Sequence, residues 1–147
     1  MSRRARRYKL ADTAQQIVGG FLLAGPFVVT AEVWELAVNM TLYHAAAVTA
    51  IVFAIGYGAL YKADDDRDVD REAEVGGVPV RFVSLMLVAF GSVLTLALVF
   101  TAPETFLVDG GMLPDPTPVR VAVTTLKAVA VGAIFSVVGA ATADSVF

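Results

Sequence analysis

Four long apolar stretches, separated by short polar connections, dominate the hydropathy pattern of the chain. They cover residues 17–40, 42–61, 82–102 and 119–141. Each stretch is long enough to cross a hydrocarbon core of about 30 Å as a helix that rises about 1.5 Å per residue. The pattern therefore predicts an all-α membrane protein, with four transmembrane helices forming a bundle in one integral membrane domain over residues 1–147.

The connections differ in character. The loop over residues 62–81 holds the acidic run Asp64–Glu74, whose alternating aspartates resemble the start of a calcium loop. Val69 and Val75, however, stand where such a loop requires glycine and glutamate, so a solvated acidic tip is the preferred interpretation. The loop over residues 103–118 contains a glycine pair followed by closely spaced prolines, which favours an irregular path over a further helix.

The distribution of lysine and arginine predicts the orientation in the membrane. If the N-terminus is inside, nine cations lie on the inner side: Arg3, Arg4, Arg6, Arg7, Lys9, Lys62, Arg67, Arg71 and Arg81. The outer side then holds only Arg120. Because cytoplasmic loops are enriched in these residues, both termini are expected to be cytoplasmic, in a multi-pass protein of the cell membrane.

The first apolar stretch is the least regular. Gly25 and Pro26 lie in its middle, and proline removes a helical hydrogen bond, so a kink is expected there. Arg3-Arg4 followed by an apolar run also resembles a twin-arginine signal, with Val29-Thr30-Ala31 as a cleavage site. A first transmembrane helix that stays in place explains more, since three further spans follow.

Composition narrows the classes of function. Hydrophobic residues make up 57% of the chain and charged residues 17%, which is too apolar for an ordinary soluble domain. The chain has no cysteine and one histidine, which argues against disulfides, thiolate metal sites and multi-histidine metal sites. The net charge of -3 and the pI near 5.0 argue against nucleic acid as a partner and are typical of a salt-rich cytoplasm.

Two of the predicted spans carry small residues at every fourth position. In the second span the small residues are Ala46, Ala50, Ala54 and Gly58. In the fourth span they are Ala128, Gly132, Ser136 and Ala140. Each series forms a ridge along one side of its helix. Small residues allow helix backbones to approach closely in lipid, where little hydrophobic force acts between helices. Both ridges are predicted helix-contact faces, although alanine and glycine are also simply common in membrane helices. Whether the ridges meet within one chain or between chains is left open.

A polar cluster is expected near the outer surface. Glu32 lies roughly 22 Å along the first span from Ile17, and Lys127 about 12 Å inward from Val119. A charge inside the membrane needs a partner, a route to the interface or a function. The similar depths therefore predict an interhelix pair between Lys127 and Glu32 or Glu35, with His44 near the same level. The alternative is that Glu35 and His44 are interfacial or capping residues, that Lys127 extends to the headgroups, and that Trp34 anchors the helix at the aromatic belt.

The segment from Gly20 to Leu36 resembles a family of small prokaryotic integral membrane proteins of unknown function, common in haloarchaea. The positions that carry the resemblance are Gly25, Pro26, Thr30, Glu32 and Trp34. The resemblance implies a multi-pass membrane protein and supplies no activity. It marks Glu32 and Trp34 as positions to test.

The preferred interpretation is a structural or accessory protein of a membrane complex. Its expected partners are the lipid bilayer and either further copies of the chain or other membrane helices. We expect no enzymatic activity, cofactor or metal, because the sequence shows no catalytic triad, phosphate loop or paired metal-ligand motif. The alternative is a small proton or cation channel or transporter subunit that uses the Glu32, Glu35, Lys127 and His44 cluster.

Overall fold

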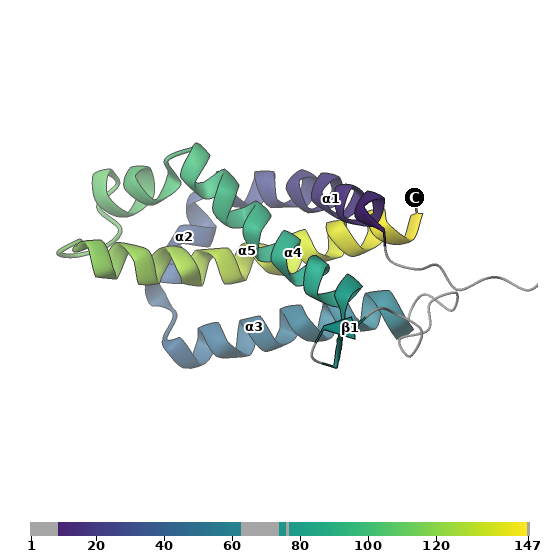
Figure 1. Cartoon of the computed structure of the whole chain (residues 1–147). Helices are drawn as coiled ribbons and strands as arrows, with labels where there is room; N and C mark the ends of the chain where they lie inside the picture. The colour runs from purple at the N-terminus through teal and green to yellow at the C-terminus, as the bar shows by residue number, and fades with distance from the viewer. Residues whose placement is uncertain (1–8, 63–73, 76, 147) are drawn as a thin grey trace, which may run out of the picture.

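The computed structural model of the chain describes residues 9–62, 74–75 and 77–146, and these residues are almost entirely helical (Figure 1). The helices, in order, are α1 Leu10–Val28, α2 Ala31–Asn39, α3 Leu42–Tyr57, η1 Gly58–Lys62, α4 Val80–Val99, η3 Pro103–Asp109 and α5 Pro118–Val146. The elements η1 and η3 are short helices with the wider π turn. The only strands in the described part are β1 Glu74–Val75 and β2 Val78–Pro79, an antiparallel pair.

Three helices are long and apolar enough to cross a membrane. They cover Leu42–Tyr61, Val80–Val99 and Pro118–Ser145, and the bent pair α1 and α2 brings the number to four if it is taken as one broken span. The predicted all-α class is therefore confirmed, together with its set of apolar helices compatible with a membrane.

The first apolar stretch is not one helix with a kink at Gly25-Pro26. Pro26 lies inside the last turn of α1, which continues to Val28, and α2 then leaves at an angle of 80°. Thr30 at the break has extended backbone angles, and its hydroxyl donates to the carbonyl of Phe27 at 3.0 Å. Because that hydroxyl binds a carbonyl in the last turn of α1, the chain turns here, four residues after the proline.

Helix α1 also begins earlier than expected, at Leu10 instead of Ile17. The extra turns place Asp12, Thr13 and Gln16 on the helix, although these polar residues weaken the apolar signal that marks a span. Helix α5 likewise continues beyond Ala141 to Val146, which adds Asp144.

The irregular path expected for residues 103–118 is wrong in its first half, where η3 forms. Helix α4 ends at Val99, and Thr101 turns the chain with a positive φ of 54°. Pro103 stands in the first turn of η3, where its missing N–H costs no hydrogen bond, and Leu107 is buried. The remaining prolines follow the helix, so they do not interrupt it.

The acidic run of the loop over residues 62–81 lies outside the described residues, apart from Glu74 in β1. The strand pair that follows turns at Gly77, whose φ of 83° suits glycine.

Helices α1, α4 and α5 form the tightly packed part of the protein (Figure 1). Gly19 of α1 and Gly139 of α5 lie so close that a Cβ on either would collide with the backbone oxygen of the other. A Cβ on Gly132 would lie 2.7 Å from Val93 of α4. Glycine therefore sets the close approach of α5 to both neighbouring helices.

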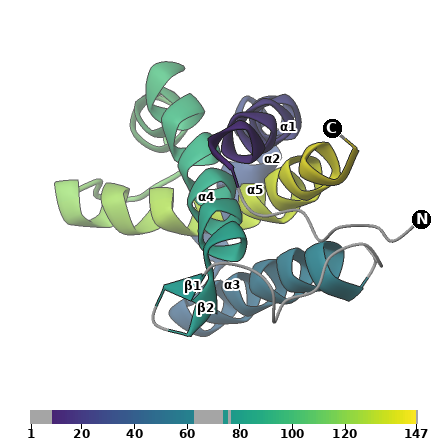
Figure 2. The ribbon, with the colours of Figure 1, turned by 45° about the vertical axis from the view of Figure 1, so that its right-hand side comes forward.

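Helix α3 lies on its own side of the molecule, below α5 in both views (Figure 2). In the most apolar 18-residue segment of the span Leu42–Tyr61, only 11% is buried inside the protein, against 44% for the same measure in α4 and 56% in α5. The C-terminal half of α3 and η1 do pack: Val52 and Leu60 are fully buried, and a Cβ on Gly56 would collide with Met86. The N-terminal half of α3 has little such cover.

The two small-residue ridges differ in burial. All four members of the α5 ridge are buried, and Ser136 donates to the carbonyl of Gly20 at 3.1 Å. On α3, the side chains of Ala46, Ala50 and Ala54 are exposed and Gly58 is half-buried. The α3 ridge therefore packs against little within this chain.

Candidate functional site

The predicted outer glutamates lie on the short helix α2. Its buried residues are Val33, Trp34 and Ala37, which face the core, whereas Glu32 and Glu35 are exposed. Glu32 stands in the first turn, where a carboxylate interacts favourably with the N-terminal end of the helix dipole. Helix α2 is thus amphipathic, and its acidic residues point away from the helices it covers.

Lys127 does not form the expected ion pair. Its ammonium group donates to the main-chain carbonyl of Met40 at 2.7 Å. Within the part of the chain that the structure describes, no ion pair within 4.0 Å joins Lys127 to Glu32 or Glu35. Met40 has extended backbone angles between α2 and α3, so its carbonyl lies outside the helical hydrogen-bond pattern and accepts from the lysine.

His44 caps helix α3. Its Nδ1 accepts from the main-chain N–H of Thr41 at 3.0 Å, and the Thr41 hydroxyl accepts from the main-chain N–H of His44 at 3.3 Å. This reciprocal arrangement is a capping box, and the histidine is exposed. The four predicted cluster residues thus lie at the α2 and α3 connection or opposite it on α5, but the structure does not join them into one network.

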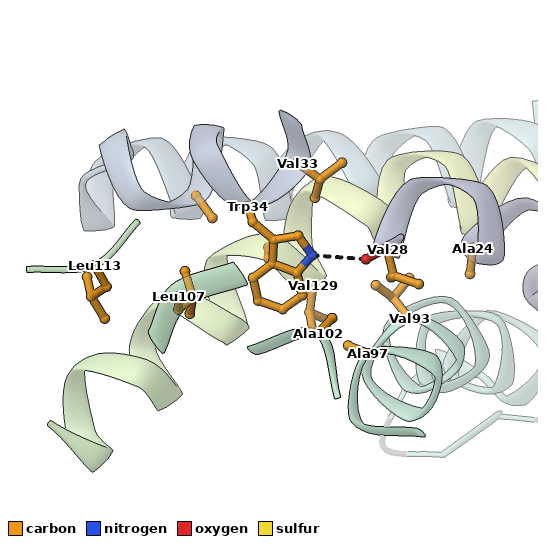
Figure 3. Close-up of a cluster of buried hydrophobic side chains, with 12 residues drawn as sticks. Ala24, Val28, Val33, Trp34, Val93, Ala97, Ala102, Leu107, Leu113 and Val129 are labelled. Carbon is orange, nitrogen blue, oxygen red and sulfur yellow. Dashed lines mark hydrogen bonds between the residues drawn. The ribbon is translucent and has the colours of Figure 1, made fainter. Parts of the chain in front are cut away.

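Trp34 is a core residue and not an exposed anchor of an aromatic belt. It is fully buried, its ring stacks near that of Phe106 with centroids 6.0 Å apart, and Leu107 and Ala102 surround it (Figure 3). Its indole N–H donates to the carbonyl of Val28 at 3.0 Å, the dashed line in Figure 3. That carbonyl lies at the end of α1 and lacks a helical donor, so Trp34 satisfies it.

These contacts explain the motif of the first span in structural terms. Pro26 occupies the last turn of α1, Thr30 bonds the end of that turn, Glu32 opens α2, and Trp34 holds the two helices together. The motif thus builds the 80° break.

A second polar group, which the sequence analysis did not single out, is buried at the opposite end of the bundle. Arg81 at the start of α4 is 1% exposed and binds two carboxylates. Its Nη1 lies 2.7 Å from Asp144 of α5, and its Nη2 lies 3.1 Å from Asp12 of α1. One guanidinium group therefore joins three helices, and its fork of donors suits this role.

Gln16 and two hydroxyls extend this buried polar network. The amide nitrogen of Gln16 donates to Asp144 at 3.1 Å, and its oxygen accepts from the Ser84 hydroxyl at 2.6 Å. The Ser84 and Thr13 hydroxyls lie 2.9 Å apart. Since these donors and acceptors face one another, the arrangement is a clasp between α1, α4 and α5.

A signal for this clasp is present in the sequence. In the predicted topology, Asp12, Arg81 and Asp144 all stand at the inner ends of their helices, where opposite charges can meet. Arg81 is also one of the nine cations that predict the orientation. The signal is weak because all three residues lie just outside the predicted spans.

An apolar groove runs between the N-terminal half of α3 and helix α5. Its volume is about 530 Å³, and its lining includes Leu42, Thr49 and Phe53 of α3 and Val123, Leu126 and Lys127 of α5. A second groove of about 550 Å³ adjoins it and reaches Met86, Phe90 and Leu94 of α4. Thr49, Phe53, Leu126 and Ala130 line both, so the two form one lateral depression.

In comparisons with known proteins, no family model, no curated protein and no solved structure matches the chain. Among residues 9–62, 74–75 and 77–146, no group of three or more histidine, cysteine, aspartate or glutamate residues could hold a metal ion.

Proposed function

We propose that the protein is a structural or accessory subunit of a complex in the cell membrane. It associates with other transmembrane helices through the exposed side of α3. The observation that carries this proposal is the contrast in burial: 11% of the most apolar segment of the α3 span is buried, against 56% of the corresponding segment of α5. A helix of span length with so little cover is available for contacts outside its own chain.

The chemistry of the exposed side fits helix association. Ala46, Ala50 and Ala54 form a low ridge along α3, and small residues let a second backbone approach closely. Large side chains stand beside the ridge: Tyr43 is 88% exposed and Ile51 is 49% exposed. A ridge of small residues with larger neighbours has the form needed for helices to interlock.

The orientation belongs to the same proposal. Asp12 and Asp144 bind the same arginine, so the two described ends of the chain lie together at one end of the bundle. The excess of lysine and arginine on the connections at that end supports a cytoplasmic location for both termini. Accessibility of single introduced cysteines in oriented vesicles tests this, because the native chain contains no cysteine to react.

Substitution on the ridge tests the association. Ala54→Leu should weaken self-association, or release co-purified membrane partners, because the longer side chain holds a neighbouring backbone away. Ala122→Leu, the same change at an exposed position of α5 that does not line the groove beside α3, is the matched control and should have no effect. The readouts are oligomeric mass in lipid nanodiscs and cross-linking in the native membrane. Equal association of both variants would contradict the proposal.

The same preparations separate this role from ion transport. Liposomes containing the native chain should show no proton or cation flux above empty liposomes. A flux that Glu32→Gln diminishes would replace the accessory role with transport.

A further inference from the structure

The groove between α3 and α5 has a positive charge at one end and apolar walls along its length. The ammonium group of Lys127 lies 2.7 Å from the carbonyl of Met40, directly before α3 begins at Leu42. Within the described residues, no carboxylate lies within 4.0 Å of it. The lysine therefore keeps a positive charge that no contacting acid balances.

The position of this charge follows from the length of α3. The span Leu42–Tyr61 is long enough to cross the hydrocarbon core, so its first residues lie near a membrane interface. Lys127, although it belongs to the interior of α5, brings its ammonium group to that level. Lipid phosphates lie at the same level, so the ammonium group can bind a phosphate while it stays at the polar interface.

The groove has the length of one lipid leaflet. Its lining on α3 extends from Leu42 to Phe53, which corresponds to about 16 Å along the helix. This is close to half of a hydrocarbon core of about 30 Å. The combined depression is bounded by residues such as Leu42, Phe53, Val123 and Phe90, and each groove lies within the usual range of volumes for ligand sites.

The C-terminal half of α3 closes the groove at one end. This closure favours a lipid chain over a helix as the occupant of the groove. Phe82 of α4 packs edge-on against both Phe53 and Tyr57, with ring centroids 6.1 and 5.9 Å apart. Leu60 beyond them is fully buried. A partner helix that spans the membrane within this groove would need an open path between α3 and α5 along their whole length, whereas an acyl chain needs only one leaflet.

From this arrangement we infer that the groove is a binding site for a phospholipid with a net negative headgroup. The headgroup phosphate accepts from Lys127, and one acyl chain lies between α3 and α5 as far as Phe53. This inference rests on the membrane placement proposed above. Ala46 and Ala50 of the α3 ridge also line the groove, so a bound lipid leaves the exposed part of α3 at Ala54 for helix association. The inference assigns Lys127, which has no glutamate partner in the described structure, a ligand outside the protein.

Native mass spectrometry of the full chain in detergent micelles tests the site. Phosphatidylglycerol and phosphatidylcholine with identical acyl chains are the probes, added in equal amounts. The native chain should retain more phosphatidylglycerol, by about fivefold for one lysine near an anionic lipid. Lys127→Met should reduce this preference to near parity, and Lys127→Arg should keep most of it.

Substitutions in the groove test the position of the acyl chain. Thr49→Phe fills both parts of the depression and should abolish retention of both lipids. Leu126→Trp, at a position that is 61% exposed, is a second blocking variant that does not disturb a buried site. Ile51→Phe is the control, because Ile51 is exposed on α3 and lines neither part of the depression.

Three results would overturn the inference: equal retention of the two lipids by the native chain, a preference unchanged by Lys127→Met, or retention unchanged by both blocking variants. A lipid-free dimer that the blocking variants dissociate would also overturn it, since the groove would then hold a second copy. The spectra also give the oligomeric mass, so lipid retention by a monomer would support the site even if helix association through α3 failed.

Discussion

Helices α3 and α5 carry the same spacing of small residues, yet the protein uses the two ridges in opposite ways. On α5 the ridge is buried, and Gly132 and Ser136 bring the helix against α4 and α1. On α3 the ridge faces outward, and the buried positions are Val52 and Gly56 on another side of the helix. The spacing allows close packing without deciding which helix will be the neighbour.

Polar groups sharpen this contrast. At the end where the described termini meet, a buried arginine, two carboxylates and a glutamine tie α1, α4 and α5 together. In the membrane placement proposed above, apolar surface alone would give little association between helices, and such a clasp would fix which helices stay together. The following substitutions test the difference between the clasped core and the exposed α3.

The largest expected effect is loss of the clasp. Arg81→Met removes the guanidinium group from the buried Asp144, and breaking a buried pair in this way costs about 3 to 5 kcal/mol. The free energy of unfolding, measured by denaturant titration in micelles with circular dichroism, should fall by that amount. Arg120→Met is the control, since Arg120 is exposed at the other end. A similar, small loss in both variants would show that the clasp does not stabilise the core.

Close helix contact gives the next effect, and its sign depends on position. Gly139→Ala places a methyl group against the backbone of Gly19 and should destabilise the protein by about 1 to 3 kcal/mol. Gly91→Ala on α4 meets open space, so the better helix propensity of alanine should stabilise by up to about 1 kcal/mol. Thermal unfolding of both variants measures the difference. Equal shifts would contradict the close contact of α1 and α5.

The break between α1 and α2 should depend on one hydrogen bond. Trp34→Phe keeps an aromatic ring in the core but leaves the carbonyl of Val28 without its donor, which costs about 1 to 2 kcal/mol. Glu32→Gln, an exposed change two residues away, should have little effect on stability. Hydrogen exchange of α2 reports the loss directly. Protection of α2 that is unchanged by Trp34→Phe would assign the break to other contacts.

The smallest expected effect is on α3. Ala54→Leu should change the free energy of unfolding of the monomer by less than about 0.5 kcal/mol, because Ala54 is exposed. The same change at the fully buried Ala133 should overpack the core and destabilise it by about 1 to 3 kcal/mol. The two measurements, made under conditions that keep the protein monomeric, compare the two helices directly. A large loss for Ala54→Leu would show that the α3 ridge packs within the chain.

The sequence by itself determined the helical class and most of the span positions, because apolar length is a local property that a single helix displays. Leu42–Tyr61 is the clearest case, since the predicted range and the helical range agree. It also predicted that the first apolar stretch is not one straight helix, since Pro26 removes a helical hydrogen bond, but it placed the bend at Gly25-Pro26 and not at Thr30.

Tertiary structure decided which side chains meet. Whether Lys127 binds a glutamate or the Met40 carbonyl depends on where the chain turns, and the turn lies at Thr30 instead of Pro26. Asp12 and Asp144 lie outside the predicted spans, so their convergence on Arg81 required the packing of three helices. The two small-residue ridges are equivalent in the sequence, and only contact with neighbouring helices made one a core face and left the other exposed. Each of these outcomes depends on pairs of residues far apart in the chain, whose distance no local pattern sets.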